Sequence, residues 1–147
     1  MTIEIRPLAP QDRADWGALW EGYLTFYKTN LAPEIYDLTF SRLLDPVRPQ
    51  WGLVALIEGR PMGLVHYIFH AHNWHDADIC YLQDLYAAPE ARGTGLGRAL
   101  IEAVREKAQA AGSSGLYWMT QEGNATARQL YDRLAEKTDF IKYRMDL

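Results

Sequence analysis

A short glycine-rich segment, Arg92-Gly93-Thr94-Gly95-Leu96-Gly97, carries the strongest chemical signal in the sequence. It follows an apolar stretch typical of a strand and precedes a stretch with helical periodicity. Glycines let backbone N–H groups approach a ligand closely, and the start of the following helix adds partial positive charge. Arg92 and Arg98 supply charge-assisted donors. The segment therefore predicts a loop that binds a phosphate or pyrophosphate, and the alternative is a strand–helix connector without a ligand.

The spacing excludes two other phosphate loops. A dinucleotide fingerprint requires a third glycine where this chain has Arg98. A nucleoside-triphosphatase loop requires Gly-Lys-Ser or Gly-Lys-Thr, which the segment lacks.

The histidines form a second cluster of residues with possible chemistry. His66, His70, His72 and His75 fall close together, and we expect His70 and His72 on one strand face, where a metal site is geometrically possible. The pattern fixes no third ligand, so we interpret the cluster as a polar hairpin tip and predict no metal. The single cysteine, Cys80, lies in an apolar run and is expected to be buried, without a disulfide.

The elements that must position these residues follow from hydrophobic periodicity and turn signals. Strands are expected near residues 3–6, 51–58, 62–70, 79–87, 116–120 and 138–145, and helices near 10–27, 33–44, 95–111 and 125–134. The first four strands suggest an antiparallel meander, and the strand–helix–strand at 79–120 suggests a parallel right-handed crossover. We predict an α/β fold with a mixed, mostly antiparallel sheet of about six strands and flanking helices.

Composition excludes several classes of protein. A chain of 147 residues suits a single domain over residues 1–147. The net charge is −4 and the basic residues form no long run, so no nucleic-acid partner is expected. No apolar window approaches the ~18 residues that span a bilayer, and the first residues lack the layout of a secretion signal. We therefore expect a cytoplasmic protein with no membrane partner.

The glycine segment also carries a family resemblance. Arg92-x-x-Gly95-x-Gly97, after the strand at 82–87, resembles the pyrophosphate motif of the Gcn5-related N-acetyltransferases (GNAT family). The resemblance continues through 116–120 and from Asn124 to Tyr131, and it is weaker before Gly52. Segments 66–69, 73–74, 81–86, 117–120 and 137–140 are similar to the histone and polyamine branch. The resemblance implies a GNAT-like acyl-CoA N-acyltransferase fold, acetyl-CoA as co-substrate, and direct acetyl transfer to a primary amine.

The resemblance also implies roles for particular residues. The expected cofactor-binding residues are Leu85, Tyr86, Ala87, Arg92, Gly93, Thr94, Gly95, Leu96, Gly97, Arg98, Asn124 and Tyr131. Backbone groups of the first three would pair with the pantetheine arm and polarise the thioester carbonyl. Asn124 occupies a helix N-cap position and would also touch the arm. Tyr131 matches the family's tyrosine that protonates the departing thiolate, with core packing as the alternative.

The sequence does not assign the general base that takes the proton from the amine. Related polyamine enzymes carry a glutamate where this chain has Gln83, which cannot titrate. Asp84 is adjacent, but strand alternation predicts that it projects to the opposite face. Glu122 could act through a water molecule, and alternatively the amine arrives neutral.

The acceptor is open as well: it could be a small amine, a polyamine-like molecule or a protein lysine. Asn73 stands where the polyamine enzymes have an aspartate, which weakens the case for a polycation. Candidate substrate-binding residues are Tyr27, Glu34, Trp74, Tyr81 and Gln83. The rival functions are a non-catalytic acyl-CoA-binding or sensor module, kept open by Gln83, and a metal-dependent enzyme that uses the histidines.

The C-terminal strand leads to a prediction about assembly. A single strand at 138–145, with Ile141, Tyr143 and Met145 on one face, would leave a neighbouring sheet edge unpaired. The related histone and polyamine enzymes look like homodimers built around this end. We therefore expect a homodimer in which the C-terminal strands contribute to the interface, with a monomer as the alternative.

Overall fold

The order of helices and strands is the one that the sequence predicts, up to the end of the last helix. The structure is a computed structural model that describes residues 1–147. Its elements are β1 (Ile3–Pro7), η1 (Pro10–Asp12), α1 (Arg13–Phe26), α2 (Pro33–Leu44), β2 (Gln50–Ile57), β3 (Arg60–His70), β4 (Ile79–Ala87), η2 (Pro89–Ala91), α3 (Leu96–Ala110), β5 (Leu116–Tyr117) and α4 (Ala125–Leu134).

The five strands form one sheet in the order β1-β2-β3-β4-β5. The first four pair antiparallel with their neighbours, as hairpins and short connections favour. β5 pairs parallel with β4. The two strands run in the same direction because α3, which connects them, returns the chain to the end of the sheet where β4 begins. The antiparallel meander and the parallel crossover are therefore both confirmed.

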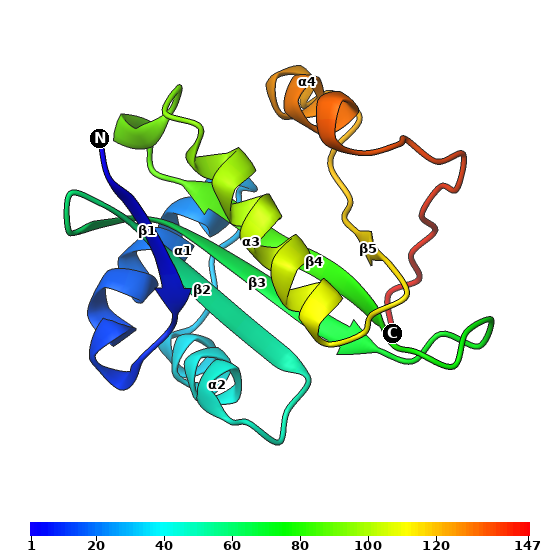
Figure 1. The fold of residues 1–147 in the computed structure, drawn as a ribbon. Coiled ribbons are helices and arrows are strands. Elements are labelled where there is room, and N and C mark those ends of the chain that lie inside the picture. The colour runs from blue at the N-terminus through cyan, green and yellow to red at the C-terminus, as the bar shows by residue number, and fades with distance from the viewer.

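Helices cover both faces of the sheet (Figure 1). α1 and α2 pack on one face and α3 on the other, while α4 stands beside β5 at the edge. The buried side of α1 comes from Trp16, Leu19, Trp20 and Leu24, which recur at helical spacing. All 24 buried hydrophobic residues belong to one cluster, so the two faces are parts of a single core.

A glycine in β3 allows α3 to approach the sheet closely. A Cβ atom at Gly63 would lie 2.9 Å from both Leu96 Cδ2 and the backbone oxygen of Tyr86. Any larger residue would therefore push α3 away from β3 and β4. Since the glycine-rich loop leads directly into α3, this contact also fixes the position of that loop relative to β4.

The strand expected at 138–145 is absent, so the sheet has five strands where the sequence predicts about six, and the predicted mixed α/β fold is confirmed. Residues 135–147 form no helix or strand, and Figure 1 shows them as an extended segment that follows α4 and turns back toward the sheet. Strand structure requires a hydrogen-bonded neighbour, and no neighbour lies beside this segment. Ile141, Tyr143 and Met145 are 75%, 88% and 82% exposed. The strand expected at 116–120 is shorter for the same reason, since β4 pairs only with Leu116 and Tyr117.

Candidate active site

The glycine-rich loop has the backbone geometry of an anion site. Gly93 and Gly95 adopt φ angles of +80° and +84°, in the left-handed region that favours glycine. Gly95 is the N-cap of α3, and a Cβ atom at either glycine would meet no atom within 4 Å. The backbone N–H groups of residues 95–98 have no hydrogen-bond acceptor within the chain. The loop therefore presents a row of free donors to solvent at a helix N-terminus.

The charges around this loop are positive and uncompensated. Arg92 and Arg98 are exposed and form no ion pair. The hydroxyl of Thr94 donates a hydrogen bond to the Ala91 carbonyl, which holds the turn, and Leu96 is buried in the core. The loop thus combines rigid attachment with an excess of donors, as a phosphate site requires.

The next feature is the divergence of β4 and β5. Their pairing is limited to Cys80 with Leu116 and Tyr81 with Tyr117, although β4 continues to Ala87. Leu85, Tyr86 and Ala87 pair with β3 on one side and have no strand on the other. An extended ligand chain can therefore hydrogen-bond to this edge of β4 as an added strand would.

Asn124 is the N-cap of α4 and Tyr131 lies within this helix, which follows β5 in the chain. The side-chain oxygen of Asn124 accepts a hydrogen bond from the Ala127 N–H at 3.5 Å, so the predicted N-cap is confirmed. Tyr131 is partly buried and its ring packs edge-on against Trp118, with centroids 5.5 Å apart. Burial, and then the nearby Tyr27 hydroxyl, raise the pKa of the Tyr131 phenol above its usual 10, which keeps it protonated as a proton donor must be.

A buried polar chain that the sequence did not reveal runs through the face of the sheet covered by α1. Trp16 Nε1 donates to His66 Nε2 at 2.9 Å, and His66 Nδ1 lies 2.7 Å from Asp84 Oδ2. Because an indole N–H can only donate, His66 Nε2 must be the acceptor nitrogen. His66 Nδ1 is therefore the nitrogen that carries the hydrogen, and its N–H donates a hydrogen bond to the Asp84 carboxyl group.

A β-bulge corrects the prediction that Asp84 faces away from Gln83. His66 pairs with Asp84 but Tyr67 pairs with Leu82, so Gln83 is an extra residue in β4. Strict alternation of strand faces fails at such a position. Gln83 and Asp84 consequently line the same cavity, of about 210 Å³, between α2 and the sheet.

Three tyrosines surround the Asp84 carboxylate. Burial, followed by the negative charge of Asp84, raises the pKa of Tyr23 and of Tyr27, and the rings of these two residues are 5.0 Å apart. Burial, Tyr117 and Asp84 in turn raise the pKa of Tyr81, whose ring stacks on Tyr117. The structure thus brings the predicted Tyr27 and Tyr81 close to Asp84, an acid that the sequence analysis did not select, and Tyr131 lies near Tyr27.

Other predicted residues lie outside this group. Glu122 is exposed in the turn before α4, and its backbone carbonyl accepts a hydrogen bond from Arg128. Glu34 is exposed in the first turn of α2. Trp74 is 82% exposed in the β3–β4 loop, where its ring contacts His72.

Comparison with known proteins identifies the fold. The model of the acetyltransferase (GNAT) family matches residues 16–135. The chain belongs to the GNAT acetyltransferase family. It is 38% identical over 144 residues to the D-amino-acid N-acetyltransferase HPA3 of Saccharomyces cerevisiae, an alignment that covers 97% of this chain and 89% of the yeast protein. The prediction of an acetyl-CoA-dependent N-acetyltransferase is thereby confirmed.

Solved structures agree on the fold of this GNAT acetyltransferase. The ribosomal-protein-alanine N-acetyltransferase of Brucella melitensis superimposes with a TM-score of 0.85 at 23% identity, over 99% of this chain and 100% of that one. The acetyltransferase AAC(6')-Iy, solved with a bisubstrate CoA analogue, superimposes with a TM-score of 0.84 at 17% identity, over 100% of both chains.

The histidines of this GNAT acetyltransferase serve separate purposes. His66 belongs to the buried chain, whereas His70 Nε2 lies 2.8 Å from the Tyr117 hydroxyl. His72 follows the end of β3 and packs against the ring of His75, so the expectation that His70 and His72 share a strand face is wrong. No three His, Cys, Asp or Glu side chains are arranged to hold a metal ion.

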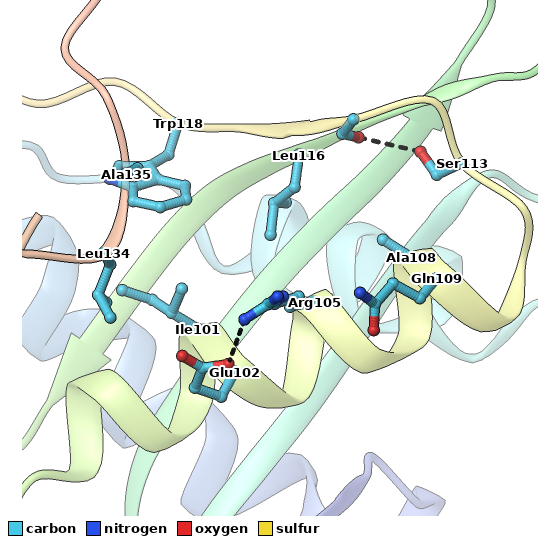
Figure 2. Close-up of a pocket in the computed structure, with 11 residues that line it drawn as sticks. Ile101, Glu102, Arg105, Ala108, Gln109, Ser113, Leu116, Trp118, Leu134 and Ala135 are labelled. Carbon is cyan, nitrogen blue, oxygen red and sulfur yellow. Dashed lines mark hydrogen bonds and ion pairs between the residues drawn. The ribbon is translucent and has the colours of Figure 1, made fainter.

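A second cavity lies away from these groups. It has a volume of about 390 Å³ and separates α3 from Leu116, Trp118 and Leu134 (Figure 2). Glu102 and Arg105 form an exposed ion pair at its rim, 3.4 Å apart. Neither the glycine-rich loop nor Asp84 lines this cavity, so its mixed apolar and polar walls need a different explanation.

Proposed function

We propose that this GNAT acetyltransferase transfers the acetyl group of acetyl-CoA to the primary amine of a small molecule by direct attack, with the cofactor pyrophosphate held by residues 92–98. The observation that carries the proposal is the row of free N–H groups at residues 95–98 beside two unpaired arginines. The free edge at Leu85–Ala87 would pair with the pantetheine arm, and Asn124 would touch it from α4. Acetyl-CoA needs no metal for this chemistry.

In this proposal Tyr131 protonates the departing thiolate, because its raised pKa keeps the phenol protonated. Glu122 relays a proton from the amine through water. Tyr27, Tyr81 and Gln83 would form the wall around the acceptor, together with Glu34 and Trp74 if the acceptor extends to the rim.

A small amine is favoured over a protein lysine by the name of the yeast relative, which acts on D-amino acids. A screen of small amines, polyamines and lysine peptides with acetyl-CoA, followed by release of free thiol, tests this. Acetylation of D-amino acids with no rate on lysine peptides is the expected result. A preference for peptides would overturn the choice of acceptor.

We also infer that residues 1–147 act as one domain, since the buried hydrophobic residues form a single cluster. We place the enzyme in the cytoplasm, because acetyl-CoA is multiply charged and does not cross a bilayer. No helix of the structure is both long and apolar enough to span a membrane. Cell fractionation with an antibody against the chain tests the location.

We infer further that two copies form a homodimer through the C-terminal arm, which we define as residues 138–147. Phe140, Ile141, Tyr143 and Met145 are each at least 75% exposed, an unusual density of exposed apolar side chains for one segment. The free edge of β5 offers unpaired backbone N–H and C=O groups to the arm of a second copy, and the 390 Å³ cavity of Figure 2 offers it apolar side chains.

Light scattering on the intact chain and on a chain that lacks residues 138–147 tests the dimer. The expected masses are a dimer for the first and a monomer for the second. The double variant Ile141→Asp/Tyr143→Asp should also be monomeric, whereas the control Lys142→Ala/Arg144→Ala should remain a dimer. A monomeric intact chain, or a dimer without the arm, would contradict the inference.

A further inference from the structure

The cavity between α2 and the bulge of β4 contains one acidic and one basic side chain. Its volume is about 210 Å³, and the two charged residues in its lining are Arg42 and Asp84. Arg42 lies in the last turn of α2 and Asp84 in β4, so the charges come from different elements. A space that holds about seven water volumes of ~30 Å³ suits a small organic molecule.

The negative charge of Asp84 has no cationic partner in the protein. Its side chain is 12% exposed, and its closest polar neighbour is the His66 Nδ1–H donor. Because Trp16 donates to His66 Nε2, His66 offers Asp84 a hydrogen bond from its Nδ1–H. No lysine or arginine lies within ion-pair distance of Asp84. A buried carboxylate without a counter-charge is costly, and a bound ammonium group would offset that cost.

Arg42, in contrast, is a positive charge without an anionic partner in the protein. It is half-buried, it forms no ion pair, and its guanidinium makes no hydrogen bond within the chain. A guanidinium presents paired N–H donors that match the two oxygens of a carboxylate. Thr39 and Gln50 also line the cavity and offer neutral hydrogen-bonding groups.

We propose that this cavity is the acceptor site and that it selects a zwitterionic amino acid, with the ammonium group on Asp84 and the carboxylate on Arg42. The inference rests on the proposed amine acetylation and adds the site of the acceptor and the two residues that recognise its ammonium and carboxylate groups. The position of Asp84 fits this role, because the next residue, Leu85, begins the free edge of β4 proposed to hold the thioester. An amine held at Asp84 is therefore placed beside the reacting carbonyl.

The test compares D-alanine with D-alaninamide, which keeps the amine and lacks the carboxylate. The wild-type enzyme should acetylate D-alanine with a kcat/KM roughly tenfold to hundredfold higher than D-alaninamide, as one charge-assisted carboxylate contact implies. Arg42→Gln should remove this preference by slowing D-alanine alone. Asp84→Asn should slow both substrates. The matched control Arg60→Gln changes an exposed, unpaired arginine at the start of β3 and should leave the preference intact.

Calorimetry separates this inference from the proposed function. Acetyl-CoA should bind the wild type, Arg42→Gln and Asp84→Asn with equal affinity, which also shows that the variants fold. D-alanine should bind the wild-type complex with CoA and should not bind the Arg42→Gln complex. Equal loss of both substrates in Arg42→Gln, or no preference in the wild type, would overturn the amino-acid site and leave amine acetylation standing. Binding of D-alanine without turnover of any amine would overturn the proposed function and leave the site standing.

Discussion

Replacement of Gly95 by glutamate tests the proposed pyrophosphate site most directly. Gly95 has φ = +84° and open space where a Cβ would be, so the substitution introduces no clash with other residues. A left-handed conformation costs a non-glycine residue ~1–2 kcal/mol, which lowers stability without preventing folding. The new carboxylate would then stand at the start of α3, where we place the anion.

The expected loss of binding follows from Coulomb repulsion. Two negative charges separated by about 6 Å, at an effective dielectric constant of about 20, repel each other by ~3 kcal/mol. This corresponds to roughly a hundredfold weaker CoA binding. The neutral variant Gly95→Gln carries the same backbone strain without the charge, so it should lose much less affinity.

Calorimetric titration with CoA at low salt measures both variants. The matched control is Gly112→Glu, because Gly112 also has positive φ (+73°) and open space, but it lies beyond the opposite end of α3. That end is about 22 Å away at 1.5 Å per residue, so the control should bind CoA normally. If Gly95→Glu bound CoA as tightly as Gly112→Glu, the pyrophosphate would lie elsewhere and our reasoning about the free N–H groups would fail.

Three further predictions concern single residues. Tyr131→Phe should keep CoA affinity and lower turnover by ~10² to 10⁴, and an unchanged turnover would assign the residue to packing. Since burial and Tyr27 raise the pKa of Tyr131, the wild-type rate should stay high up to about pH 10 and decline only above it. Glu122→Gln should flatten the rise of rate with pH if it relays a proton, and an unaltered pH profile would remove it from the mechanism. Asp12→Asn should lower the free energy of unfolding by about 1–2 kcal/mol, because Arg6 and the Ala9 N–H bind the Asp12 carboxylate at 2.7 to 2.9 Å and Arg6 is partly solvated. These contacts hold the Asp12 pKa below 3.8, so the stability they contribute is present above that pH and is lost as pH falls through the lowered value; denaturant titrations that differ equally at pH 3 and pH 7 would contradict this.

Most of the fold could be predicted because its signals are local. The strand at 79–87 and the helices at 33–44 and 125–134 have the predicted boundaries, since proline, glycine and an N-cap asparagine mark their ends. The strand expected at 138–145 failed because strand formation depends on a neighbour, and periodicity cannot show whether a neighbour exists.

The candidate site could be predicted only where its residues lie close together in the sequence and form a recognisable motif. The loop at 92–98 and the Asn124 cap were found from their residue types and spacing. The chain of Trp16, His66 and Asp84 joins α1, β3 and β4, and its members lie 50 and 18 residues apart in sequence. The sequence held one signal, since His66 is a polar residue within an apolar strand segment. Only the packing of α1 on the sheet shows what His66 contacts.

The bulge in β4 has a consequence for how this enzyme and its relatives diverge. Because Gln83 and Asp84 open onto one cavity, an acidic group can move by one position in the sequence and still reach the same acceptor. A glutamate at position 83 and an aspartate at position 84 are then two solutions to one requirement. Lineages could exchange them through an intermediate that carries both, without passing through a form that has lost its acid. A position-by-position comparison would score such a change as the loss of an acidic residue, although the charge of the cavity had been kept throughout.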